Sequence, residues 1–417
     1  MNNSEIIETS HDTSQFYFFT VLYIILDYAR IYQVVHLGFM RPMLILMAIL
    51  IFFIINGGQY HRTKNRQVTY MWLFILLLGC HIPFAQNNHL AYIAASTQLL
   101  YMPFILSVII TVNSFSRLQK FILILICIEV YIAIYALTHA GYGPGNYFED
   151  ENDLALYINL WIPFCYFLFF SYEKLLPKLI CLTGLVVGIF SIVVSFSRGG
   201  FIGLIATGAV IWFFSRRKVI ATLMIMVLVS MMMIFAEDKY WDEMSTSTSM
   251  EEDSTGKERI ESWKSGIFMF IDNPFGVGGN NYPVRFPEYQ TEYFQRGMYG
   301  RAAHSIWFTL IPELGVIGIF IYAMLLFYNL KDIFRLKNIS FHDDSKGIDK
   351  EKKFLNYTGR AFIASLVGFF ATGTFLSVLY YAHYWYLTGL IAASAAIMNE
   401  YADRAKENQI NKEQEIF

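Results

Sequence analysis

Residues 177–215 read PKLICLTGLVVGIFSIVVSFSRGGFIGLIATGAVIWFFS. Lys178 and Arg198 are the only charged residues in this stretch. An α-helix needs about 20 apolar residues to cross the hydrocarbon core of a bilayer, which is about 30 Å thick. Two runs of this kind are present, and the segment 195–200, SFSRGG, separates them. The stretch therefore predicts two membrane-spanning helices joined by a short loop.

The composition of the whole chain points the same way. Of the 417 residues, 56% are hydrophobic and only 15% are charged, and the mean hydropathy is +0.43. A soluble globular protein usually carries about 25% charged residues. Low charge with abundant aromatic residues also excludes a disordered chain and a small disulfide-rich secreted module. An integral membrane protein remains.

The pattern of residues 177–215 recurs along the chain. We expect an all-α, polytopic membrane protein with about a dozen spans. The predicted spans lie near 14–30, 39–57, 69–86, 91–111, 119–139, 153–171, 177–196, 199–215, 218–236, 304–328, 359–378 and 380–398. An even number of spans puts both chain ends on the same side of the membrane.

The distribution of Lys and Arg predicts the orientation, because these residues are retained on the cytoplasmic side. With both ends in the cytoplasm, the short outer loops hold only Arg30, Arg41 and Arg198. The predicted organisation is nine spans within 1–236, a large outer loop at 237–303, three spans within 304–398 with a basic cytoplasmic loop near 329–358, and a cytoplasmic tail at 399–417.

The large outer loop contains its own helix signal. Residues 255–258 form a capping-box pattern, the apolar residues of 260–271 recur at helical spacing, and 272–274, DNP, form a stop. We expect a helix at the membrane surface. The following residues 276–281, GVGGNN, predict a flexible turn, and the Tyr- and Arg-rich stretch 282–301 can line a sugar-binding groove.

Arg198, Arg259 and His304 come from three separate parts of the chain, and the predicted topology puts all three on the outer side. Gly199 and Gly200 permit a tight reversal that holds Arg198 near the membrane boundary. The two guanidinium groups suit a pyrophosphate, and the imidazole offers a base near neutral pH. At the start of a helix, the ring of His304 would be kept neutral.

Structural interpretations remain open for each residue. Arg198 can be an interfacial side chain that only reaches toward water. Arg259 can be a surface charge paired with Glu258 or Asp253, and His304 taken alone is more often structural than catalytic.

Carboxylates supply further candidates. Glu313 lies nine residues beyond His304, on the opposite face of an ideal helix, so we expect it to pair with another helix. The acidic run 149–153 can ligate a divalent metal, although a solvated outer loop is favoured. Asn152 and Asp153, which are nearest the membrane, are expected to face a sugar.

Several motifs together resemble a known family. They are SFSRGG at 195–200, GKERIESW at 256–263, NPFGVGG at 273–279, and AHSIW at 303–307 with ELG at 313–315. In this order they resemble the O-antigen ligase and Wzy-type polymerase superfamily. The segment 143–153, GPGNYFEDEND, looks most like the branch of O-glycosylation ligases associated with exosortase systems.

The resemblance implies a glycosyltransferase of the GT-C type in the bacterial inner membrane. Such an enzyme moves a glycan from undecaprenyl pyrophosphate to an acceptor hydroxyl on the periplasmic side, without a metal, nucleotide sugar or other cofactor. It implies that Arg198 and Arg259 hold the pyrophosphate and that His304 is the base. The family often has Gly directly before the loop arginine, where this chain has Glu258.

The acceptor stays open. A ligase of lipopolysaccharide synthesis acts on lipid A core, a Wzy-type polymerase on another lipid-linked glycan, and a protein O-glycosyltransferase on a protein. Outside these enzymes, a polysaccharide flippase also has about a dozen spans, but charges near the membrane midplane and internal repeats are typical of transporters. If the protein were instead a scaffolding membrane protein, the order of the motifs in the outer loops would be a coincidence.

Overall fold

The structure is a computed structural model that describes residues 3–57, 60–145, 147–148, 150–223, 226, 230, 254–294, 300–339 and 346–415. Every regular element in these ranges is helical, as the composition predicts. The long helices are α1 (Asn3–Ala29), α3 (Pro42–Asn56), α4 (Arg66–His81), α5 (Asn88–Thr111), α6 (Phe115–Thr138), α7 (Glu151–Phe169), α8 (Leu175–Val194), α9 (Arg198–Phe214), α12 (Ser254–Asp272), α14 (Ile306–Lys337), α15 (Lys346–Gly373) and α16 (Ala382–Glu415). Shorter elements are α2 (Ile31–Val34), α13 (Tyr282–Tyr289) and the 3₁₀ turns Gly38–Met40 and Tyr60–Thr63.

Eleven of the predicted spans coincide with long helices, and the span 218–236 falls mostly outside the described residues. By length and composition alone, five helices of the described chain can cross a membrane: Gly38–Asn56, Asn88–Thr111, Phe115–Thr138, Leu175–Val194 and Ile306–Lys337. Helix α9 is apolar but shorter than these five. The all-α membrane fold is therefore confirmed, whereas the number of crossings and the division into segments stay predictions.

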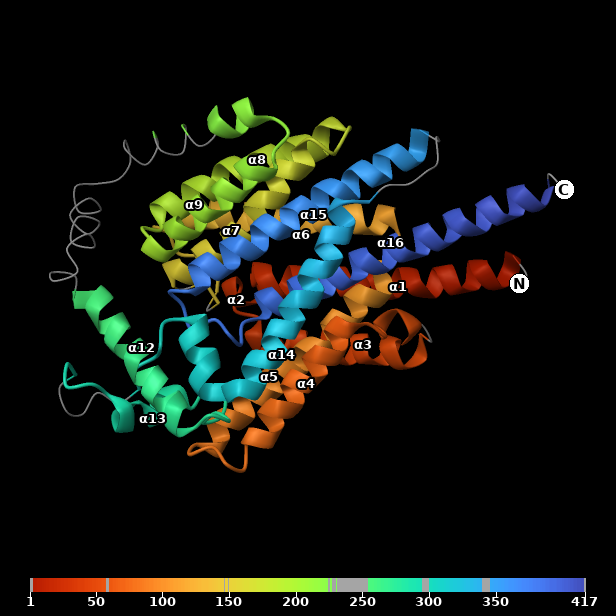
Figure 1. Cartoon of the computed structure of the whole chain (residues 1–417). Helices are drawn as coiled ribbons and strands as arrows, with labels where there is room; N and C mark the ends of the chain where they lie inside the picture. The colour runs from red at the N-terminus through yellow and green to blue at the C-terminus, as the bar shows by residue number, and fades with distance from the viewer. Residues whose placement is uncertain are drawn as a thin grey trace.

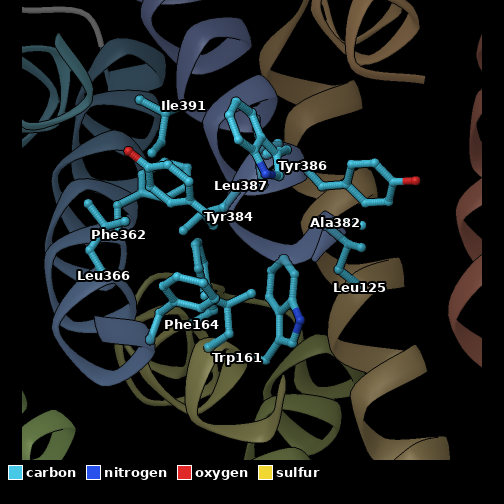
Figure 2. Close-up of a cluster of buried hydrophobic side chains, with 14 of the residues drawn as sticks. Leu125, Trp161, Phe164, Phe362, Leu366, Ala382, Tyr384, Tyr386, Leu387 and Ile391 are labelled. Atoms are coloured by element: carbon cyan, nitrogen blue, oxygen red, sulfur yellow. The ribbon is translucent and has the colours of Figure 1, made fainter. Parts of the chain in front are cut away.

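Helix α7 lies at the centre of the bundle. Its residues from Leu154 to Leu168 are all buried, and it packs against α6, α8, α9 and α15. In Figure 2, Trp161 and Phe164 of α7 point toward Tyr384 and Leu387 of α16. Because water is excluded from both faces of α7, its N-terminal turn is held in a fixed position at one end of the bundle.

Close packing between α9 and α15 holds a second pair of helix ends together. A Cβ added to Gly203 of α9 would lie 1.9 Å from Oγ1 of Thr372, and one added to Gly368 of α15 would lie 2.2 Å from Oγ1 of Thr207. Only glycine permits this approach. The start of α9 therefore lies beside the end of α15.

The predicted outer-loop helix is confirmed as α12, which ends at Asp272 as the DNP stop predicts, and its position at the membrane surface stays a prediction. Helices α12 and α13 gather at one end of the bundle, at the lower left of Figure 1, whereas the start of α1 and the end of α16 lie together at the right. Both chain ends therefore lie away from α12.

Helix α14 is broken at Gly315, whose φ of 62° and ψ of −161° are not helical. The segment after α12 bonds to the exposed backbone at this break: Val277 N donates to the oxygen of Pro312, Gly278 N to that of Glu313, and Val316 N to that of Pro274, each within 3.0 Å. The predicted flexible turn is thus fixed by backbone hydrogen bonds on α14.

Candidate functional site

Arg198 is the first residue of α9. Ser197 caps the helix, because its hydroxyl accepts a hydrogen bond from Gly200 N at 2.9 Å. The left-handed residue of the turn is Phe196, with a φ of 54°. The expectation that Gly199 and Gly200 supply the reversal is therefore wrong. These glycines are helical and permit close packing, since a Cβ on Gly200 would lie 2.2 Å from Cβ of Ala155.

Asn152 and Asp153, in the first turn of α7, lie close to this start of α9. Oδ1 of Asn152 accepts a hydrogen bond from the hydroxyl of Ser197 at 2.6 Å, next to Arg198. Oδ2 of Asp153 accepts a hydrogen bond from the hydroxyl of Tyr381 at 3.2 Å. Both predicted sugar-facing side chains thus bind neighbouring loops, and whether they also contact a sugar stays a prediction.

Arg259 lies on α12 and is half-buried. Its guanidinium carbon lies 6.0 Å from the ring centre of Phe375, which follows α15. Gly199 lies against the same side chain, because a Cβ added to it would be 3.4 Å from Cβ of Phe375. Phe375 therefore contacts the elements that carry both predicted arginines. Asp253, a predicted partner of Arg259, lies outside the described residues.

His304 lies two residues before α14, where Ser305 is the N-cap residue. His304 was expected at the start of this helix, but it lies just before the helix begins. The backbone of His304 is left-handed, with a φ of 45°. Helix α12 holds this segment: Nε1 of Trp263 donates to the oxygen of Ala303 at 3.0 Å, and the Trp263 ring stacks on Phe308 with 4.9 Å between centres.

The charges around His304 favour its neutral form. The residue is exposed, yet the surrounding protein disfavours the charged ring, and this desolvation is the largest cause of a lowered pKa of His304. The positive charges of Arg259 and Arg301 lower the pKa of His304 further, while Asp150 opposes them. His304 is therefore suited to accept a proton at neutral pH.

Arg301 was not singled out as a candidate from the sequence. Its Nη2 donates to Oε2 of Glu258 at 2.8 Å, and its Nε donates to the hydroxyl of Ser262 at 2.7 Å. Its place three residues before His304 is the one sequence signal that could have drawn attention to it. Phe375 was also missed, because no local pattern marks it, whereas Asp150 belongs to the acidic run that the sequence does mark.

Glu313 is buried in α14, and its partners come from the start of another helix, α13, and from Tyr380, which lies just before α16. Its carboxylate accepts hydrogen bonds from Asn280 N at 2.9 Å, from Tyr282 N at 3.0 Å and from the Tyr380 hydroxyl at 2.7 Å. Two of these donors are backbone groups at the start of α13. Glu313 therefore fastens the outer segment 273–289 to α14.

Other expectations concern ligands. In the part of the chain that the structure describes, no group of three or more His, Cys, Asp or Glu residues could hold a metal ion, and Glu149 of the acidic run lies outside that part. Within the stretch 282–301, residues Tyr282–Tyr289 form α13, and residues 295–299 lie outside the described residues. A sugar-binding groove there stays a prediction.

Comparison with known proteins gives one result. Residues 183–323 match the family model described as O-Antigen ligase. The matched region contains Arg198, Arg259, His304 and Glu313, together with α12 and its contacts to α14. No curated protein matches the sequence. This part of the chain is therefore similar to the O-antigen ligase family, which is a family of polytopic membrane proteins.

Proposed function

We propose that the protein transfers a glycan from undecaprenyl pyrophosphate to an acceptor hydroxyl on the periplasmic face of a bacterial inner membrane, as an O-antigen ligase. One observation carries this proposal. Arg198, Arg259 and His304 all fall in the region that matches the family, and contacts through Phe375, Trp263 and Ala303 hold their segments at one end of the bundle.

The periplasmic location of that end is supported by charge. The short loops that the predicted topology places outside contain only three Lys or Arg residues: Arg30, Arg41 and Arg198. Few basic residues are expected in loops that crossed the membrane. The two chain ends lie together at the far end of the bundle (Figure 1), which agrees with both being cytoplasmic.

His304 is proposed as the general base. It removes the proton of the acceptor hydroxyl while that oxygen attacks the anomeric carbon of the donor from the side opposite the pyrophosphate. A carbon–oxygen bond forms to the acceptor, the bond to the pyrophosphate oxygen breaks, and the anomeric configuration inverts. The neutral ring that this step needs is favoured by the lowered pKa of His304.

Arg198 and Arg259 are proposed to bind the leaving group. The negative charge on the departing lipid pyrophosphate grows as the bond breaks, and guanidinium groups stabilise such charge with forked hydrogen bonds. Loss of one such donor typically costs about 10²–10³-fold in kcat. Arg198→Lys keeps the charge but loses the fork, so it should retain more activity than Arg198→Ala.

The test is the glycan profile and donor-lipid pool of a strain that lacks the gene, complemented at equal membrane abundance. Wild type should clear the donor lipid, whereas His304→Ala and Arg198→Ala should leave it on the periplasmic face. Arg41→Gln, which changes an exposed arginine of another outer loop, should complement fully. Full complementation by His304→Ala would sink the proposed mechanism.

The same experiment separates the alternatives. The missing product identifies the acceptor: capped lipid A core for a ligase, longer glycan chains for a Wzy-type polymerase, or a glycoprotein for a protein O-glycosyltransferase, including the exosortase-associated branch. Donor lipid that accumulates on the cytoplasmic face would instead indicate a flippase.

A further inference from the structure

A second cluster of positive charge lies at the opposite end of the helices that meet at the candidate site. Helix α9 runs from Arg198 to Phe214, and Arg216 follows its end. Helix α14 ends at Lys337. Arg360 lies in the N-terminal half of α15, whereas Phe375 follows the C-terminal end of that helix. The 17 residues of α9 span about 25 Å, close to the thickness of a bilayer core.

The side chains of Lys337 and Arg360 converge on Phe214. Nη1 of Arg360 donates a hydrogen bond to the backbone oxygen of Phe214, and Nζ of Lys337 lies 4.5 Å from the centre of its ring. Helices α14 and α15 are in backbone contact here, because a Cβ added to Gly359 would lie 2.8 Å from the nitrogen of Lys337. Arg216 lies near enough to Arg360 for their two positive charges to interact.

Arg360 is only 8% exposed. Its Nε is buried and has no hydrogen-bond partner within the described residues. None of the ion pairs found in those ranges involves Arg216, Lys337 or Arg360. A buried guanidinium with an unsatisfied N–H and like charges beside it is unfavourable unless an anion compensates it.

The topology of the chain does not require such an arrangement. Retention of a loop in the cytoplasm needs positive residues in that loop, but it does not need a buried arginine. A phosphate group, in contrast, accepts the forked hydrogen bonds of an arginine and is attracted by neighbouring cations. At the end of a membrane helix, the phosphates within reach are those of lipid headgroups.

We propose that Arg216, Lys337 and Arg360 bind the phosphate of an anionic phospholipid headgroup, at the end of the bundle opposite His304. The lipid would bridge the ends of α9, α14 and α15. This site does not depend on the glycan-transfer proposal, because none of its residues belongs to the candidate site.

The test uses the full chain purified in detergent and titrated with short-chain phosphatidylglycerol, with the thermal unfolding midpoint and native mass spectrometry as readouts. A ligand that binds only the folded state raises the midpoint in proportion to its affinity. We expect phosphatidylglycerol to raise the midpoint of wild type. Arg360→Gln should weaken the apparent affinity about tenfold or more, since it removes charge-assisted hydrogen bonds.

Two further variants provide a control and a second test of the site. Lys350→Gln removes one charge from the same end, but that lysine is exposed and already bonded to Glu173 at 2.8 Å, so lipid affinity should not change. Lys337→Gln tests the site again if Arg360→Gln fails to fold, and it should also weaken binding.

Three results would overturn the proposal. Equal phosphatidylglycerol affinity in wild type, Arg360→Gln and Lys337→Gln would exclude the site. Equal stabilisation by phosphatidylcholine would exclude selectivity for an anionic headgroup. Equal stabilisation by inorganic phosphate at the same concentration would show that a free anion, and no lipid, occupies the cluster.

Discussion

Nη2 of Arg301 donates a hydrogen bond to Oε2 of Glu258 over 2.8 Å, and this ion pair joins helix α12 to the segment that leads into α14. Glu258 directly precedes Arg259, and Arg301 precedes His304 by three residues. The side chains of Glu258 and Arg301 are 34% and 17% exposed. The pair therefore fixes the segment of the proposed base relative to the segment of a proposed pyrophosphate ligand.

Breaking this pair should cost activity more than stability. A partly exposed ion pair contributes about 0–1 kcal/mol, so Glu258→Gln should barely change the unfolding midpoint. A small misplacement of the reacting groups, however, costs up to about 10²-fold in rate. We expect kcat of glycan transfer to fall about tenfold, with a smaller change in KM.

The matched control is Lys264→Gln, which breaks the Lys264–Glu261 pair of 2.7 Å on the same helix. That pair lies within α12 and does not reach the His304 segment, and its lysine is 55% exposed, so kcat should not change. If both variants lose the same activity, the effect belongs to α12 as a whole and the Glu258–Arg301 pair has no special role.

The pH dependence of transfer should show an acidic limb below pH 6.5. Desolvation, Arg259 and Arg301 lower the pKa of His304 from its usual value of 6.5. A base is active in its unprotonated form, and a lower pKa keeps His304 unprotonated to a lower pH. The measurement is kcat/KM against pH in reconstituted vesicles.

Two substitutions should move this limb in opposite directions. Arg301→Gln removes a positive charge, so the pKa of His304 rises and activity is lost at a higher pH. Asp150→Asn removes the negative charge that raises the pKa of His304, so the limb moves to a lower pH. Shifts in the same direction in both variants would contradict a role of His304 as the titrating base.

Replacing the carboxylate of Glu313 should destabilise the protein. Glu313→Gln keeps one acceptor oxygen but turns an amide N–H₂ toward a donor, which leaves a buried polar group unsatisfied at a cost of about 1–3 kcal/mol. Tyr380→Phe removes only one of the donors, and its cost should be about 1 kcal/mol. Thermal unfolding in detergent measures both.

Glu288→Gln is the control, because Glu288 pairs with Arg285 at 2.9 Å near the same segment but is 45% exposed. Its unfolding midpoint should match wild type. An unchanged midpoint in Glu313→Gln would show that the three hydrogen bonds of Glu313 do not hold the outer segment.

The sequence predicts most helices because an apolar run of sufficient length has one stable solution in a bilayer. Helix α8 is expected at 177–196 and lies at Leu175–Val194, and α12 follows from its own start and stop signals. These signals are local, and the hydrophobic effect and backbone hydrogen bonding act on them without reference to the rest of the chain.

The contacts around the candidate site could not be predicted in this way. Arg301 and Glu258 are 43 residues apart, and the donors to Glu313 come from residues 31, 33 and 67 positions away. An isolated charged residue in a loop has many possible partners. Which one it finds depends on the packing of α12 on α14, and no periodicity in the sequence encodes that packing.

The break in α14 supplies the last prediction. At Gly315, a φ of 62° with a ψ of −161° is a conformation that only glycine adopts without strain. A Cβ at this position would also lie 2.3 Å from the oxygen of Pro274, the atom that accepts the hydrogen bond of Val316 N. Gly315→Ala should therefore push the segment 273–279 away from α14.

Backbone strain of this kind costs about 1–3 kcal/mol, and the displaced segment would lose its hydrogen bonds as well. We expect Gly315→Ala to lower the unfolding midpoint and to expose residues 273–289 to protease. Glycan transfer should fall too, because the same segment follows the helix that carries Arg259. Gly208→Ala is the matched control, since a Cβ on Gly208 of α9 meets no atom within 4 Å and alanine favours a helix. If Gly315→Ala is as stable and as resistant to protease as Gly208→Ala, the break in α14 does not anchor the outer segment, and the coupling between α12 and α14 must rest on Trp263 and Arg301 alone.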